Sequence, residues 1–155
     1  MCKVRVFMRE PISVSVFLYR ETRNQRQYLL LKRVPRPDLA LSGFWQSVTG
    51  GKELGESLQK AAIREVFEES GICISNIGKS IYQYEYAIKP EWQSKYAREH
   101  NTIQEFVFSA PVSTDPILSS EHCEFGWFSF ERAKAMLEFQ LSIKALAVIE
   151  ASLAT

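Results

Sequence analysis

Apolar and polar positions alternate from residue 12 and become continuously apolar toward residue 19. This pattern predicts a strand that is partly buried on both faces. The polar residues 21–25 predict a reversal of the chain, so residues 27–33 are expected to return as a second strand. Further short strands are expected at residues 44–48, 81–88, 103–108 and 125–128.

One helix is the clearest element of the sequence. Between residues 58 and 69, apolar and small side chains recur at spacings of three and four positions, as on one face of a helix. Ser57 is expected to cap its start and Gly71 to end it, because serine accepts from the free N–H groups and glycine adopts the left-handed conformation. Gly50 and Gly51 are expected to break the chain before this helix.

Two more helices are expected near the end of the chain, at residues 130–139, capped by Ser129, and at residues 142–152. The order of strands, helix, strands and helices predicts an α/β fold of the mixed α+β type, with helices packed on a mixed sheet. No repeat or linker divides the sequence, so residues 1–155 are expected to form one domain.

The charge composition limits the classes of ligand that the protein is expected to bind. There are 19 Lys and Arg residues against 18 Asp and Glu residues, so the net charge is only +1. Such a chain has no overall field that attracts a nucleic acid polymer or an anionic membrane, and no apolar run is long enough to span a bilayer. An anionic small molecule must therefore be held by a local cluster.

The cysteines indicate a reducing compartment. Cys2, Cys73 and Cys123 have neither CxxC spacing nor the even count of a disulfide framework. They are expected to be reduced thiols, which predicts a cytoplasmic location.

Acidic side chains gather on the clearest helix. Glu65, Glu68 and Glu69 are spaced i, i+3 and i+4, so they are neighbours on its surface, and Glu56 lies just before it. One interpretation is a solvated surface helix. The other is a site for a hard cation such as Mg²⁺, which relieves the repulsion between carboxylates. Arg64 is expected to pair with Glu68 or Glu56.

Residues 50–72 resemble the Nudix box, which reads Gly, five residues, Glu, seven residues, Arg-Glu, aliphatic, any, Glu-Glu, any, Gly and aliphatic. Every fixed and aliphatic position is occupied, by Gly50, Glu56, Arg64, Glu65, Val66, Glu68, Glu69, Gly71 and Ile72. The resemblance implies the Nudix α/β/α sandwich and a Mg²⁺-dependent hydrolysis of a diphosphate bond, with Mn²⁺ as a substitute ion.

The resemblance also implies roles for single residues. It makes Glu65 and Glu69 the principal metal ligands and Glu68 a further ligand, directly or through water, with the Gly50 carbonyl contributing. Gly50, Glu56 and Gly71 shape the motif. The implied catalytic residues are Arg64, Glu65, Glu68 and Glu121.

A second motif lies downstream, where the pair Glu121-His122 precedes Trp127. It is similar to a frequent partner of the Nudix box. By this likeness Glu121 is a further metal ligand or the general base, whereas the alternative is an exposed loop carboxylate. His122 is expected to be structural or to donate a hydrogen bond behind the ligands.

Residues 10–16, 44–50, 101–102 and 121–122 look like those of bacterial dihydroneopterin triphosphate pyrophosphohydrolases, a group also described as dATP pyrophosphohydrolases. This similarity implies a small nucleotide or pterin triphosphate that is split into a monophosphate and pyrophosphate. The loop at residues 34–43 is longer than in that group, which leaves the base preference open. The matching substrate-contact positions are Arg9, Arg33 and Thr49.

Four aromatic residues could stack on a flat ring of the substrate: Tyr84, Tyr86, Trp92 and Tyr96. Of these, Tyr86 is the predicted substrate contact. The alternative for the strand tyrosines is packing on the sheet, and Trp45 and Trp127 are expected in the core. Two other functions stay open: a Nudix hydrolase of dinucleoside polyphosphates or nucleotide sugars, and a Nudix module that senses a nucleotide without cleaving it.

Overall fold

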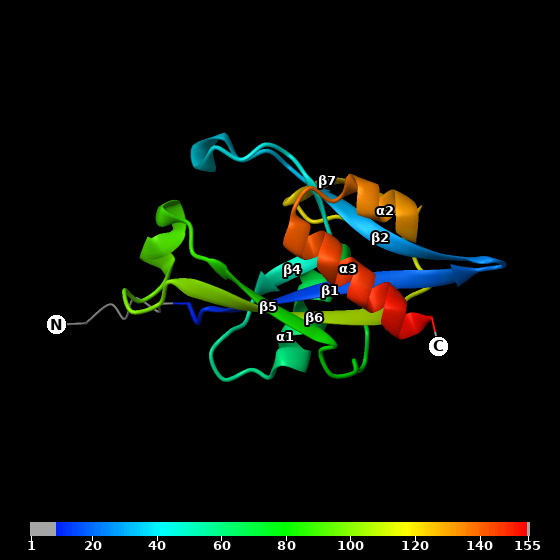
Figure 1. Ribbon diagram of the computed structural model, residues 1–155, viewed down its shortest axis with the longest axis horizontal. Helices are drawn as coiled ribbons and strands as arrows, with labels where there is room; N and C mark the ends of the chain where they lie inside the picture. Colours follow the sequence, from blue (N-terminus) through cyan, green and yellow to red (C-terminus); the bar gives the residue numbers. More distant parts are fainter. Residues whose placement is uncertain (1–8, 155) are drawn as a thin grey trace.

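In the described part of the chain, seven strands form a mixed sheet at the centre of the molecule (Figure 1). The computed structural model describes residues 9–154. The strands are β1 (Ile12–Thr22), β2 (Gln25–Arg33), β3 (Trp45–Gln46), β4 (Val48–Gly51), β5 (Tyr82–Ala87), β6 (Thr102–Pro111) and β7 (His122–Ser129). β1 pairs with β2 in an antiparallel hairpin and with β6 in parallel, while β5 and β7 pair antiparallel with β6 and β2. The predicted mixed sheet is confirmed.

The hairpin strands β1 and β2 separate along their length. They pair with each other only from Tyr19 and Tyr28 to the turn. Beyond this point the freed edge of β1 pairs with β4, where Val14 lies opposite Gly50, and the freed edge of β2 pairs with β3. The segment from β3 to β4 therefore fills a fork between two long strands, and backbone hydrogen bonds hold it on both sides.

The short third strand predicted at residues 44–48 is thus two strands, interrupted at Ser47. The prediction that Gly50 and Gly51 break the chain before the helix is wrong, because both lie in β4 and pair with Val14 and Ser13 of β1. The break falls at residues 52–57. Strand pairing dominates here because a glycine carries no side chain to obstruct the layer above the sheet.

Helices cover both faces of the sheet, as predicted. The face covered by α1 (Leu58–Ser70) contains the core residues Val14, Val16, Leu29, Leu31, Val48, Ala62 and Val66. The opposite face lies under α2 (Phe130–Met136) and α3 (Gln140–Leu153) and contains Phe17, Tyr28, Leu30, Val107, Leu146 and Ile149. Figure 1 shows α3 in front of the sheet and α1 behind it.

The ends of α1 are those that the sequence predicts. The Ser57 hydroxyl accepts a hydrogen bond from the Lys60 N–H at 3.1 Å. Gly71 has a φ of 69° and its N–H donates to the Phe67 carbonyl, so it ends the helix in the left-handed conformation. These two caps fix the start and the rotation of the helix that carries the acidic residues.

The helix predicted through residue 139 ends earlier, at Met136. Ser129 caps its start as predicted, by accepting from the Arg132 N–H at 3.2 Å. Leu137 is extended and buried, and it bridges to Trp45 of β3. Burial of this leucine in the core outweighs continuation of the helix.

Two irregular segments lie outside the layers. The loop after β2 contains the short 3₁₀ helix η1 (Pro37–Leu39), and the loop after β5 contains η2 (Pro90–Lys95). In the part of the chain that is described, no helix is long and apolar enough to cross a membrane. Cys2 lies outside the described residues, whereas Cys73 and Cys123 are exposed free thiols.

Candidate active site

The acidic residues of α1 fall into two groups. Glu65 and Glu69 face the sheet and are only 9% and 3% exposed, whereas the side chain of Glu68 is 52% exposed. Positions i and i+4 lie almost above one another on a helix, and position i+3 is rotated away from them. The structure therefore brings Glu65 and Glu69 together beneath the helix and leaves Glu68 at its rim.

Glu69 is a buried carboxylate with few polar neighbours to stabilise its charge. Its Oε1 accepts a long hydrogen bond from the Thr49 N–H at 3.3 Å and lies 4.0 Å from Nε2 of His122. Burial, followed by repulsion from Glu65 and Glu121, raises the pKa of Glu69 to about 9, against the lowering by Thr49 and Arg33. Without a cation beside it, this side chain holds its proton at neutral pH.

Glu65 is buried against the backbone of β4. A Cβ atom at Gly50 would lie 2.0 Å from its carboxyl carbon, so only glycine fits there. Burial raises the pKa of Glu65 to about 7, and the hydrogen bond from Arg64 at 2.8 Å opposes this rise. The charges of Glu68 and Glu121 contribute the smaller part of this rise. Glu65 and Glu69 thus share one buried region, in which Arg64 and Arg33 offset only part of their negative charge.

Arg64 fastens the acidic residues to the loop before α1. Its Nη2 donates to Glu56 at 2.7 Å and to the Gly51 carbonyl at 2.8 Å. Its Nε donates to Glu56, and its Nη1 donates to Glu65 and Glu68. Both predicted pairings of Arg64 are therefore present. Because all three nitrogens are engaged, the guanidinium holds Glu56 and Glu65 in fixed rotamers.

The Glu121-His122 motif approaches α1 from the other side. The Glu121 charge acts on Glu65 and Glu69, and its carboxylate is 3.9 Å from Arg33. His122 belongs to β7 and is 4% exposed, and neither ring nitrogen has a hydrogen-bond partner among the described residues. Burial lowers the pKa of His122 to about 4, so the ring is neutral.

This donor set fits a hard divalent cation. Among residues 9–154, no three His, Cys, Asp or Glu side chains already converge as a ready-made cation cage. Two buried carboxylates nevertheless share a region where, among the described residues, Arg64 and Arg33 offset part of their charge, and Glu65 lies against the backbone of Gly50. Carboxylate and carbonyl oxygens of this kind suit Mg²⁺, which takes its other ligands from water and phosphate.

The predicted substrate-contact residues are distributed around this region. The Thr49 hydroxyl accepts from Gln46 at 2.8 Å, and the Gln46 Oε1 atom is buried with no partner among the described residues. Arg33 reaches toward Glu121, and the Arg9 N–H donates to the Lys95 carbonyl. Neither Gln46 nor Lys95 was singled out by the sequence, because long-range folding alone brings them here.

The tyrosines of β5 form a ladder on the face that α3 covers. The rings of Tyr82, Tyr84 and Tyr86 are 6.0 and 6.3 Å apart, and Tyr82 and Tyr84 pack on the core. The Tyr84 hydroxyl donates to the buried Glu105. Sheet packing therefore accounts for Tyr84, while Tyr86 lies at the open end of the ladder beside Ser13 and Tyr96.

The two tryptophans lie where the sequence places them. Trp45 packs against the α2/α3 side of the sheet with its ring 5.5 Å from that of Phe128, and Trp127 packs on the α1 side. The Trp127 indole donates to Asp115 at 2.8 Å. Both are parts of the packed layers.

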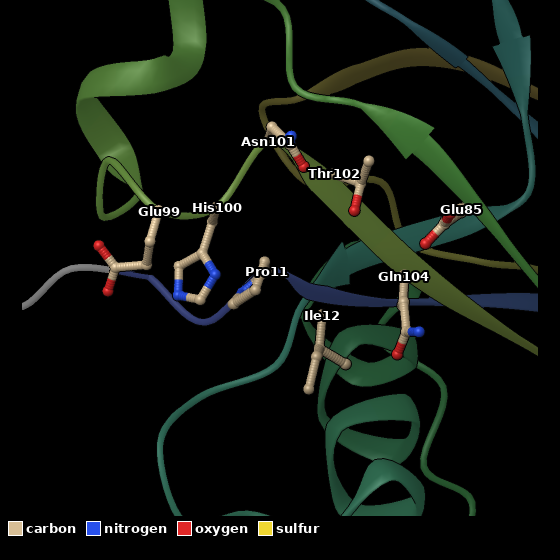
Figure 2. A pocket seen from close by; sticks show the side chains of 8 residues that line it. All are labelled: Pro11, Ile12, Glu85, Glu99, His100, Asn101, Thr102 and Gln104. Atoms are coloured by element: carbon tan, nitrogen blue, oxygen red, sulfur yellow. The ribbon is translucent and has the colours of Figure 1, made fainter.

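A separate hollow of about 280 Å³ opens between the ends of β1, β5 and β6 (Figure 2). Its described lining includes two carboxylates, Glu85 and Glu99, and neither Lys nor Arg. A polyphosphate is repelled by such a lining. The hollow also lacks the acidic residues of α1, so the candidate site is the open surface around Glu65 and Glu69.

Comparisons with known proteins agree with this geometry. The family profile described as NUDIX domain matches residues 9–147. The dihydroneopterin triphosphate diphosphatase of Haemophilus influenzae is 35% identical over 86% of this chain and 84% of its own length. The protein with the same name from Escherichia coli is 31% identical over 86% and 87%.

Solved structures share the fold. The E. coli dihydroneopterin triphosphate pyrophosphohydrolase superposes with a TM-score of 0.71 at 28% identity, covering 92% of this chain and 98% of that one. A NUDIX hydrolase from Listeria monocytogenes superposes with a TM-score of 0.75 at 25% identity, covering 93% and 94%. These matches span both the acidic helix and the strands that support it.

Proposed function

Because this chain belongs to the Nudix family and is a hydrolase of diphosphate bonds, we propose that it splits a nucleoside or pterin triphosphate into a monophosphate and pyrophosphate. Dihydroneopterin triphosphate is the first candidate substrate and dATP the second. The choice is supported by relatives that carry the name dihydroneopterin triphosphate diphosphatase and align over most of both chains. The reaction is supported by one observation above the others, the buried pair Glu65 and Glu69, of which Glu65 is bonded to Arg64 and Glu69 accepts only a long hydrogen bond from the Thr49 N–H among the described residues.

Nudix hydrolases use divalent metal ions, and we assign Mg²⁺ to this one, with Mn²⁺ as a substitute. Glu65 and Glu69 are the proposed principal ligands, because burial leaves their charge to be balanced by a cation. Glu68, Glu121 and the Gly50 carbonyl are the proposed additional oxygen donors. When bound, the cation offsets the charge that develops on the phosphates and lowers the pKa of water.

The chain's own residues orient this site. Arg64 holds Glu65 and Glu56, so the ligand rotamers are fixed before substrate arrives. His122 is neutral and its Nε2 lies 4.0 Å from the Glu69 carboxylate, so the ring packs beside this ligand without adding a charge. Gly50 leaves the space that Glu65 occupies.

The proposed step is substitution at phosphorus. A water oxygen forms the new bond to phosphorus, the bridging P–O bond breaks, and pyrophosphate leaves. Glu121 either takes the proton of this water as the general base or binds the cation, in which case the proton passes to solvent water, and its exposed carboxylate is accessible in both roles. Arg9 and Arg33 hold the departing phosphates.

A product assay tests the proposal. Purified protein with Mg²⁺ is incubated with dihydroneopterin triphosphate, dATP, diadenosine tetraphosphate and ADP-ribose, and the products are separated. We expect pyrophosphate and a monophosphate from one or both triphosphates, and intact diadenosine tetraphosphate. Cleavage of the dinucleotide or the nucleotide sugar alone would replace the substrate assignment, and no cleavage at all would favour a nucleotide-sensing module.

A further inference from the structure

Four cationic side chains from three separate segments approach one another at the rim of the candidate site. Arg9 precedes β1, Arg33 ends β2, Arg36 follows in the loop, and Lys95 ends η2. The Arg9 N–H donates to the Lys95 carbonyl at 2.9 Å, which ties η2 to the start of β1. The ammonium of Lys95 lies within electrostatic reach of all three arginines and of Asp38.

The four cations differ in how closely an acidic side chain pairs with each of them. The Arg36 guanidinium donates to both oxygens of Asp38, at 3.1 and 2.9 Å, so this pair is largely satisfied. Arg33 is 3.9 Å from Glu121, which is too long for a hydrogen bond. Lys95 is exposed and stands among three cations and one carboxylate. Repulsion among the cations lowers the pKa of Lys95, after the larger effect of its partial burial.

Arg33 connects this cationic group to the acidic one. Its charge acts on Glu69 and on His122, and its guanidinium faces Glu121. An anion that lies beside Arg33 at the edge of the acidic group is therefore also within electrostatic reach of Lys95. A chain of phosphates has this extent and carries several negative charges.

We propose that Lys95 binds the phosphate chain of the substrate, together with Arg9, Arg33 and Arg36, and that η2 with its hydrogen bond to Arg9 positions it for this purpose. This inference rests on the proposed function for the identity of the ligand, a triphosphate. A phosphate oxygen between the four cations relieves their repulsion. The loop between β5 and β6 is thereby a part of the binding site as well as a connection between strands.

The same loop offers a matched control. Lys89 is also an exposed lysine at the border of η2, and its ammonium lies 5.1 Å from the centre of the Trp92 ring, on which it stacks. Removing either lysine changes the net charge by one unit. Only Lys95 lies among the arginines of the rim.

The test measures binding apart from catalysis. Isothermal titration in Mg²⁺-free buffer follows inorganic tripolyphosphate binding to wild type, Lys95→Gln, Lys95→Arg and Lys89→Gln. We expect Lys95→Gln to weaken binding about five- to tenfold, the change typical of one charged contact at a partly exposed site. Lys95→Arg should retain most of the affinity, and Lys89→Gln should match wild type.

Kinetics give the second readout. With the best triphosphate, Lys95→Gln should raise KM by a similar factor and leave kcat within about twofold. Equal tripolyphosphate affinity of Lys95→Gln and wild type, an equal loss in Lys89→Gln, or no binding to wild type would each overturn the proposal. Specific loss of tripolyphosphate binding without turnover of any triphosphate would instead retain the anion site and reject the proposed function.

Discussion

Glu150 of α3 and Glu69 of α1 are both acidic side chains on helices that pack against the sheet, but their surroundings differ. Glu150 accepts hydrogen bonds from the Tyr28 hydroxyl and from Arg26. Arg26 also donates to Glu21 and to the Leu153 carbonyl, so it connects the β1–β2 hairpin to α3. Among residues 9–154, Glu69 has a single long hydrogen bond, from a backbone N–H, and no Lys or Arg side chain in direct contact.

The comparison distinguishes a carboxylate that stabilises the fold, Glu150, from one that is suited to bind a ligand, Glu69. A partly buried carboxylate with an arginine and a hydroxyl contributes to stability, and removing its partner is costly. A buried carboxylate without partners destabilises the free protein and gains when a cation binds. Mutations around Glu150 should therefore change the free energy of unfolding, whereas mutation of Glu69 should change turnover.

The largest expected effect is that of a mutation at Glu69. Glu69→Gln removes the charge at nearly constant volume, and we expect kcat to fall by about 10³-fold, the loss that follows removal of one strong electrostatic contact in an active site. The melting temperature without metal should not decrease, because the metal-free Glu69 is already protonated at neutral pH and glutamine is a neutral side chain of nearly the same size. Turnover is measured with saturating Mg²⁺, and a wild-type rate in this variant would contradict the metal assignment.

On the paired side, Arg26→Ala should lower the free energy of unfolding by about 3 kcal/mol, because it leaves Glu150 without its cation. Denaturant unfolding measures this loss, and kcat at a temperature where the variant is folded should stay within about twofold. Arg23→Ala in the neighbouring exposed turn is the control and should change stability by less than about 0.5 kcal/mol. A large loss of kcat with unchanged stability would reverse the distinction.

Glu121→Ala should have an intermediate effect. Its carboxylate is exposed and faces Arg33, so the fold does not depend on it. We expect kcat to fall roughly 10- to 100-fold with a smaller change in KM, whether the residue binds the cation or accepts the proton. Steady-state kinetics decide the point: a raised KM at unchanged kcat would move Glu121 out of the chemistry and into substrate binding.

Glu105 is an intermediate case, and its variant should show the smallest effect. It is 7% exposed and accepts from the hydroxyls of Ser13, at 3.0 Å, and Tyr84. Burial raises the pKa of Glu105 to about 7, against a small opposing effect of Ser13. A carboxyl whose folded pKa is raised stabilises the fold at low pH, and this contribution is lost as the pH rises from about 4.5 to about 7.

The variant Glu105→Gln removes this pH dependence. Relative to wild type, its free energy of unfolding should increase by about 2 kcal/mol between pH 5 and pH 7. The difference between variant and wild type is the quantity to follow, because Glu65 and Glu69 titrate equally in both proteins. Parallel stability curves over this range would show that Glu105 is charged and well solvated in the folded protein.

Local patterns in the sequence were sufficient to predict the acidic helix. The period of its apolar residues and the caps Ser57 and Gly71 depend only on neighbours along the chain. The helical spacing also placed the three carboxylates on one side. It did not show that Glu65 and Glu69 turn to the sheet while Glu68 faces solvent, because this depends on how the helix is rotated against β4.

Features that arise from pairing between distant segments were missed. The split of β3 from β4 follows from the separation of β1 and β2, and the early end of α2 follows from the bridge between Leu137 and Trp45. Lys95 is 86 positions from Arg9 in the chain. Single-sequence patterns of charge and polarity contain no information about such contacts until the topology is known.

The fork in the sheet has a consequence for how this enzyme can diversify. Hydrogen bonds to β1 and β2 hold β3 and β4, so the backbone of Thr49 and Gly50 is fixed independently of the segment that leads into it. The preceding loop at residues 34–43 can therefore grow or shrink over generations without shifting the register beneath the acidic helix. Substrate preference can therefore change in related proteins while the residues proposed to cleave the bond keep their positions.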